Sequence, residues 1–188
     1  MKYKKTHKIK KYQGGFSLLE LMIVVAIIGV TAAIAVPVML NPIHKVKKAA
    51  RELMGDMQGT KLGALRSNTD WAIVFDTANN RYLVCSDRGG DNTWSNTADN
   101  TIVKTVDFSD HTSGVSYGAG AATFDATVDQ DPLPADFVSY NANVLTFNAL
   151  GSCNSGFIYL DYNNSAFAVG TLSTGIVRIR HWNNGAWQ

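Results

Sequence analysis

The chain has 188 residues, enough for one globular domain with an extended element and too few for two ordinary domains. Its formal net charge is +2, but six of its 17 basic residues are lysines within the first 15 residues, where there is no acid. The rest of the chain holds 11 basic residues against 15 acids and is mildly acidic, at −4. The overall basic charge is therefore no indication that the body of the protein binds nucleic acid.

The first predicted element is a hydrophobic helix that follows the basic leader, residues 1–15. The sequence GGFSLLE over 14–20 leads into a run without a charge up to Ile43. Since about 20 apolar residues span a bilayer, the segment 16–43 is long enough for a transmembrane helix. A carboxylate in a membrane costs roughly 2.5–3.5 kcal/mol or more, so Glu20 is expected to have a function. The leader lysines outnumber the basic residues that follow the helix, which keeps the leader in the cytoplasm and the body outside it.

Two plainer interpretations of this N-terminus are alternatives. A secretory signal peptide also has a basic start, and Ala33-Ile34-Ala35 would serve as its cleavage site, but the apolar run exceeds the usual core of roughly 7–15 residues. A simple membrane anchor explains the length and leaves Glu20 without a purpose. Locally, Ser17 and Glu20 also have the spacing of a capping box, in which both side chains cap the first helical turn.

The helix is predicted to continue over 44–67 as an amphipathic segment. Its predicted buried face consists of Val46, Ala49, Ala50, Leu53, Met57 and Ala64. From Phe16 to Arg66 such a helix would be roughly 75 Å long at about 1.5 Å per residue. Pro37 and Pro42 each remove a helical hydrogen bond, so a kink or local melting is expected there.

Three glycines, Gly55, Gly59 and Gly63, recur every four residues on this amphipathic segment. Small residues at this spacing let a helix approach its packing partner closely, although each weakens the helix by up to about 1 kcal/mol relative to alanine. We expect that partner to be the sheet of the same domain.

From residue 68 the pattern changes to short β-rich runs separated by Asn, Asp, Gly and Ser, which predicts a globular antiparallel β domain over 68–188. The predicted strands are Trp71–Asp76, Arg81–Ser86, Thr101–Phe108, Val144–Phe147, Gly156–Tyr162, Ala166–Thr171 and Ile176–Trp182. A hairpin joins the first two strands and a meander joins the last three. Two long polar loops, 87–100 and 118–136, are expected to be surface features.

The basic leader, the Gly15–Phe16 junction and Glu20 together resemble the N-terminus of type IV pilins and pseudopilins. The resemblance implies that a prepilin peptidase cleaves between Gly15 and Phe16, with N-methylation of the new Phe16 amine. It also implies that Glu20 meets the N-terminus of a neighbouring subunit during assembly. The implied fold class is α+β: a long N-terminal α-helix, transmembrane in its N-terminal half, packed against a C-terminal antiparallel β-sheet domain.

The arrangement is similar to the H-type branch, the GspH/FimT family of minor pilins and pseudopilins. Its local matches are FNALG at 147–151, GFIYL at 156–160 and GIVRIR at 175–180. The partners implied are other pilin or pseudopilin subunits, prepilin peptidase, an inner-membrane assembly platform and membrane lipids. The location implied is the bacterial inner membrane, single-pass with an extracytoplasmic domain, and afterwards the pilus. A type IV pilus, a type II secretion pseudopilus, a DNA-uptake pilus and a membrane-anchored domain that never polymerises are alternatives.

Arg178 and Arg180 are two residues apart in a predicted strand, which puts both guanidinium groups and Trp182 on one face. Such a pair beside an aromatic ring can hold phosphate and stack on a base. DNA-uptake members of the family resemble this with a Gly-Arg-x-Arg motif, and this implies DNA as a partner. Here two residues separate Gly175 from Arg178, so the match is imperfect. The plainer interpretation is a solvent-facing strand edge that carries charge.

Cys85 and Cys153 are the only cysteines. An even number in an exported chain favours a disulfide between them, the alternative being two unrelated small buried residues. There is no zinc signature, because the cysteines lack C-x-x-C spacing and His44, His111 and His181 are scattered.

Other chemistry is not indicated by the sequence. The acid-rich loop with Asp125, Asp129, Asp131 and Asp136 has no EF-hand spacing, so a solvated loop is expected there and not a calcium site. There is no nucleophile elbow, no phosphate loop and no acid pair whose spacing specifies a reaction. The sequence therefore predicts a structural protein without cofactor or metal, and not an enzyme.

Overall fold

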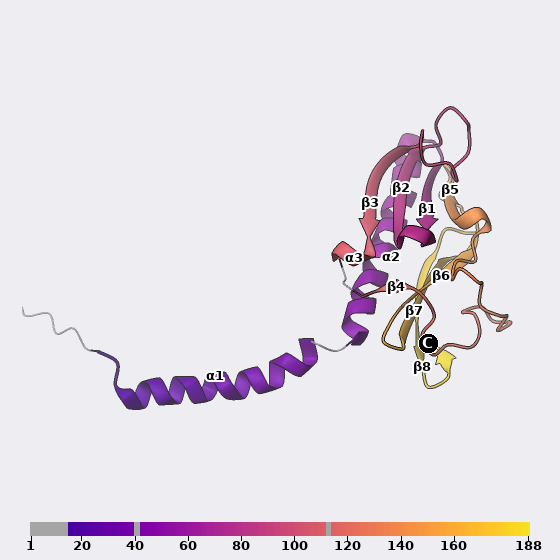
Figure 1. Ribbon diagram of the computed structural model, residues 1–188. Helices are drawn as coiled ribbons and strands as arrows, with labels where there is room; N and C mark the ends of the chain where they lie inside the picture. The colour runs from indigo at the N-terminus through magenta and orange to yellow at the C-terminus, as the bar shows by residue number, and fades with distance from the viewer. Residues whose placement is uncertain (1–14, 40–41, 112–113) are drawn as a thin grey trace, which may run out of the picture. The chain divides into compact units, whose positions relative to one another are not determined.

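The computed structural model describes residues 15–39, 42–111 and 114–188 (Figure 1). The chain divides into two compact units, Met1–Leu40 and Asn41–Gln188. The predicted leader, except Gly15, lies outside the described residues. Each unit is described by itself below.

The first unit is built on one apolar helix, α1, Leu18–Met39. Its large hydrophobic side chains from Leu18 to Val30 are exposed by 49–78%. A helix that is hydrophobic on all sides is normally covered by other protein or by lipid. Among the described residues, no helix has the length and hydropathy that a membrane crossing requires.

The second unit begins with the amphipathic helix α2, Pro42–Ser67. Proline is favoured at the first helical position because its missing amide hydrogen is not needed there. All six residues of the predicted apolar face are at most 2% exposed, so the face predicted from helical spacing is confirmed. Thr60 joins this buried face and donates a hydrogen bond to the carbonyl of Asp56, 2.7 Å away.

The sequence predicted one long helix from Phe16 to Arg66, with a kink or local melting at Pro37 and Pro42, and the structure has two helices. α1 ends at Met39 and α2 begins at Pro42, so Pro42 lies at a helix boundary. Pro37 lies within α1. The division between the two units falls between Leu40 and Asn41, inside the predicted membrane segment 16–43.

Two antiparallel sheets follow α2. The first has the order β3-β2-β1-β5 and the second the order β4-β6-β7-β8-β9. The strands are β1 Trp71–Asp76, β2 Arg81–Asp87, β3 Thr101–Asp107, β4 Ser116–Tyr117, β5 Val144–Phe147, β6 Gly156–Tyr162, β7 Ser165–Thr171, β8 Val177–Asn183 and β9 Ala186–Trp187. The seven predicted strands are confirmed, each within one residue of its predicted ends.

Short elements complete the second unit. They are a four-residue helix α3, Phe108–His111, and two 3₁₀ turns, η1 Thr77–Asn79 and η2 Asn141–Asn143. η1 forms the turn of the predicted hairpin between β1 and β2, which is confirmed. The helix α3, the turn η2 and the two-residue strands β4 and β9 were not predicted. A strand of two residues is too short to show the alternation by which strands are recognised.

The main core lies between α2 and the inner faces of both sheets (Figure 1). Alternate residues of the first sheet, such as Ile73 and Tyr82, face this core and are fully buried. From the second sheet, Val177 and Ile179 of β8 pack against the same cluster. The fold predicted from the sequence, a helix packed on an antiparallel β domain, is therefore confirmed for 41–188.

Most residues of the two long loops are exposed, as predicted, but a few residues of each loop also pack on the outer face of a sheet. Trp94 packs on a cluster of the first sheet that includes Val74 and Leu83. From the loop 118–136, Ala126 is fully buried and Asp125 is 7% exposed, against residues of the second sheet. Each sheet therefore lies between α2 on one side and a loop on the other.

The glycines of α2 have different surroundings, and the prediction that all three pack on the sheet of the domain is wrong. At Gly63 a β-carbon would lie 2.6 Å from Cε3 of Trp71, so this glycine is needed for close packing. At Gly55 and Gly59 a β-carbon would meet nothing within 4 Å. These two glycines lie on the exposed side of α2.

Candidate functional site

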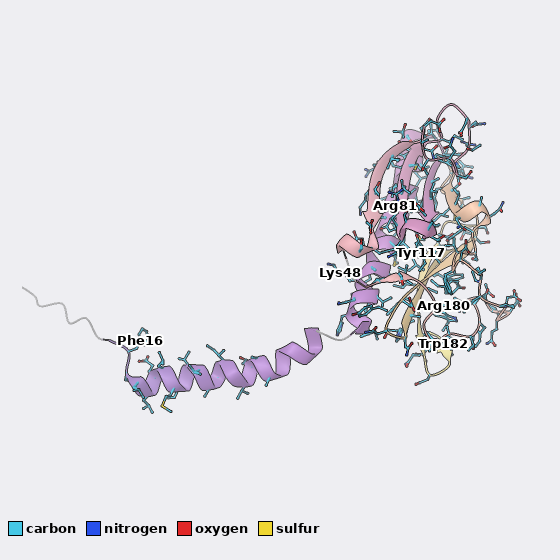
Figure 2. The ribbon with its side chains drawn as sticks, viewed as in Figure 1. Phe16, Lys48, Arg81, Tyr117, Arg180 and Trp182 are labelled. Atoms are coloured by element: carbon cyan, nitrogen blue, oxygen red, sulfur yellow. The ribbon has the colours of Figure 1, made fainter. Side chains whose placement is uncertain are left out.

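The predicted cleavage junction lies at the start of α1. Phe16 is 83% exposed at the N-terminal end of this helix (Figure 2). The amide of Glu20 donates a hydrogen bond to Oγ of Ser17, 3.1 Å away, which caps the first turn. The junction therefore leads directly into a capped helix start.

The Glu20 carboxylate itself is exposed, and no partner for it is found among the described residues. A complete capping box would also have this carboxylate accept a hydrogen bond from the amide of Ser17. Only the half made by the Ser17 hydroxyl is present. The carboxylate is therefore available to a partner outside the chain.

Arg178, Arg180 and Trp182 lie on the outer face of β8, on alternate residues of the strand. Arg180 and Trp182 lie close together in Figure 2. The Trp182 ring packs edge-on against Phe124, at 5.0 Å between ring centroids, and against Trp187, at 5.3 Å. These contacts occupy the ring, so Trp182 is not free to stack on a base.

Two of the three segments that gave the local family matches, 147–151 and 175–180, meet at one place in the fold. Lys61 of α2 donates a hydrogen bond from Nζ to the carbonyl of Gly175, 3.0 Å away. Gly175 has a φ of 76° and lies so close to Gly151 that a β-carbon would be 2.0 Å from the Gly151 carbonyl oxygen. Only glycine fits there. The FNALG turn and the start of β8 are therefore held against α2 and against each other.

An ion-pair cluster that the sequence did not predict joins α2 to the edge strand β3. Lys104 Nζ lies 2.7 Å from Oδ2 of Asp56 and 3.5 Å from Oε1 of Glu52. Tyr82 donates a hydrogen bond to Asp56 at 2.6 Å. Burial disfavours the charged lysine, but the hydrogen bond and attraction from Asp56 outweigh it and raise the pKa of Lys104. The cluster positions α2 on the sheet and has no chemistry of its own.

In the acidic loop, the carboxylate of Asp125 is hydrogen-bonded within the loop itself. Asp125 accepts hydrogen bonds from the amide of Thr127, at 3.1 Å, and from its hydroxyl, at 2.7 Å, which is a local turn. In the described part of the chain, no group of three His, Cys, Asp or Glu side chains is arranged to hold a metal ion. The structural role of Asp125 is to shape the loop over the second sheet.

Comparison with known proteins identifies the N-terminus. A family model described as the prokaryotic N-terminal methylation motif matches residues 10–36, a segment that contains the Gly15–Phe16 junction and Glu20. The N-terminus of the chain therefore carries a prokaryotic N-terminal methylation motif. The resemblance stated from the junction is thereby confirmed.

Two solved structures resemble the chain. The minor pseudopilin EpsH from the type 2 secretion system of Vibrio cholerae has 11% sequence identity and a TM-score of 0.47, over 72% of this chain and 95% of that one. The type IV minor pilin FimU of Pseudomonas aeruginosa has 14% identity and a TM-score of 0.43, over 77% and 93%. No curated protein sequence matches the chain.

The predicted disulfide is wrong, because Cys85 and Cys153 are both free. The strand pairing places the two cysteines three strands apart. Cys85 on β2 pairs with Ala72 on β1, and Ala72 pairs with Thr146 on β5. Phe147, the next residue of β5, pairs with Cys153. Three strand spacings of about 4.8 Å put the cysteines about 14 Å apart, twice the roughly 7 Å that a disulfide allows. They also lie on different faces, since Cys85 belongs to the outer cluster and Cys153 packs on the main core.

We therefore expect two free thiols in the protein. Burial raises the pKa of Cys85 to about 11 and also raises that of the half-buried Cys153, so neither is much ionised at neutral pH. Thiol titration of unreduced protein should give two thiols after denaturation and slow reaction before it, with Cys153 reacting first. Denatured, unreduced protein without any titratable thiol would contradict the arrangement of the strands.

Proposed function

We propose that the protein is a minor pilin or pseudopilin, a structural subunit of a type IV pilus or a type II secretion pseudopilus. The observation that carries the proposal is α1, an apolar helix whose large side chains from Leu18 to Val30 are exposed. Its start lies within a methylation motif. A helix of this kind needs a cover, and packing against the corresponding helices of neighbouring subunits would supply one.

In this proposal, prepilin peptidase cleaves between Gly15 and Phe16, and Phe16 becomes an N-methylated terminal amine. Glu20 then pairs with the Phe16 ammonium of a neighbouring subunit within the apolar filament core. A carboxylate in apolar surroundings needs such a cation or must be protonated. Support comes from the Glu20 carboxylate, which has no partner within the described chain.

Before assembly, the subunit would be held in the bacterial inner membrane by residues 16–43, with 68–188 outside the cytoplasm. The support is the uncharged run from Leu21 to Ile43 and the six lysines that precede it. The assembly platform of the inner membrane and the membrane lipids would be its partners there. The role is structural, and no catalytic function is proposed.

Processing is the direct test of this proposal. Protein recovered from its native host should begin at Phe16, because the basic leader meets the apolar helix at Gly15–Phe16. Removal of the leader takes away six lysines and makes the mature chain acidic. Intact mass or N-terminal sequencing measures this. A chain that begins at Val36 would support a signal peptide instead, and an intact Met1 would support a membrane anchor that never polymerises.

A DNA-binding minor pilin of a DNA-uptake pilus is the second candidate. The observation in its favour is that Arg178 and Arg180 lie on one exposed face and have no ion-pair partner among the described residues. Phosphate contacts by these residues would weaken as salt rises. The packed Trp182 ring and the acidic charge of the body count against it.

A further inference from the structure

The surroundings of Arg178 and Arg180 indicate a binding site. On β7 they are paired with Gly170 and Ala168, which are too small to cover them. In the part of the chain that the structure describes, neither guanidinium group has an ion pair or a hydrogen bond. Arginine offers five donors in a planar fork that suits a carboxylate or a phosphate. Both forks are therefore free for a ligand.

The two arginines line a groove of about 410 Å³. Apolar atoms of Phe157, Leu172 and Val128 line it as well. The loop residues 125–129 lie on it and bring two carboxylates, Asp125 and Asp129. A groove of this size accommodates a short peptide segment, with an apolar lining and a few polar groups that fix orientation.

We propose that this groove, defined by Arg178, Arg180 and the loop 125–129, binds an acidic segment of a neighbouring protein subunit. The two arginines are about 7 Å apart along the strand, because a strand rises about 3.3 Å per residue. Carboxylates on alternate residues of an extended segment have the same separation and lie on one face. An acid-x-acid sequence in extended conformation is therefore complementary to the groove.

A protein carboxylate fits this groove better than a nucleic acid does. The carboxylate of Asp129 is exposed, and Asp125 is held in its turn, so a continuous row of phosphates would meet two negative charges at the same wall. The ring of Trp182, which would have to stack on a base, is packed against Phe124 and Trp187. A short acidic segment carries only the two charges that meet the arginines, so it meets less repulsion from the loop than a continuous row of phosphates does.

The identity of the partner as another subunit rests on the proposed function, whereas the binding itself does not. Full-length protein in nonionic detergent should be titrated into a fluorescently labelled, end-blocked hexapeptide with glutamates on two alternate residues. We expect saturable binding, seen as a rise in fluorescence anisotropy. The double variant R178A/R180A should weaken it by about tenfold or more, since hydrogen bonds to charged groups are lost.

Two controls separate the groove from general charge effects. R51A/R66A removes two exposed arginines from α2 and should leave binding unchanged. D129N removes a repelling charge from the groove and should strengthen binding by about two- to fivefold. Peptides with glutamines, or with the glutamates on adjacent residues, should bind more weakly than the alternating peptide.

The outcomes that would overturn the proposal are distinct. Equal weakening by R51A/R66A and R178A/R180A would mean attraction by net charge alone. Binding of a 20-base-pair duplex that is lost in R178A/R180A, without binding of the acidic peptide, would assign the groove to nucleic acid. Failure of both would leave it without a ligand, while cleavage at Gly15–Phe16 would still test the filament role separately.

Discussion

Replacing Glu20 with alanine should exclude the protein from filaments while leaving its β domain folded. The change removes a carboxylate from the apolar helix, so the monomer should enter the membrane at least as well as before. In the proposed filament, the Phe16 ammonium of a neighbour would then lie in an apolar core without its counter-charge. Breaking a buried pair by removing one partner costs about 3–5 kcal/mol, which corresponds to a loss of incorporation of more than a hundredfold.

The measurement is the amount of the variant in sheared filaments and in membranes. S17A is the matched control, because it removes the hydroxyl that caps the helix at 3.1 Å and keeps the carboxylate. It should cost about 0.5–2 kcal/mol of helix stability and leave incorporation largely intact. Equal incorporation of wild type and E20A would mean that Glu20 only favours the start of its own helix.

Replacing Leu53 with alanine should destabilise the globular unit strongly. Leu53 is fully buried on α2, in the cluster that α2 forms with both sheets. Truncation of a buried leucine leaves a cavity and typically costs about 2–5 kcal/mol. Since small domains are stable by about 5–15 kcal/mol in total, a large share of the stability should be lost. Urea unfolding followed by tryptophan fluorescence measures it.

Leu62→Ala is the matched control for this prediction. It lies on the same helix and undergoes the same chemical change, but its side chain is 50% exposed. The change in the free energy of unfolding should stay within about 0.5–1 kcal/mol. Equal destabilisation by the two variants would contradict the orientation of α2 on the sheets.

The sequence predicted those helices and strands whose residue pattern repeats several times, over several helical turns or several alternating strand positions. The buried face of α2 followed from helical spacing, because Leu53 and Met57 recur where the helix meets the sheets. The strands followed from alternation and from the polar residues between them. Glu20 stood out because a charge within an apolar run is costly.

Contacts between distant segments were not predictable in this way. The even number of cysteines gave no indication that Cys85 and Cys153 lie on different faces of the fold. The four-residue spacing of Gly55, Gly59 and Gly63 predicted that they share a helix face. It could not predict that only Gly63 contacts the sheet. These outcomes depend on which element packs over which, and that is set by the whole chain.

The groove at Arg178 and Arg180 has one part that the sequence predicted and one part that it did not. Their shared face follows from the two-residue period of a strand, and the sequence predicted it. The loop that completes the groove comes from residues 125–129, about 50 positions earlier in the chain. The polar composition of this loop predicted that it is solvated, whereas Ala126, which belongs to the loop, is fully buried. A polar loop can therefore still cover a sheet when small apolar residues are spaced within it.

The central claim is that α1 assembles into a filament after the leader is removed. The most direct measurement is the intact mass of the protein in sheared filaments from its native host. The account predicts that chains in that fraction begin at Phe16 and carry one N-methyl group. Protein that occurs only in the membrane fraction, with its N-terminus still at Met1, would contradict it.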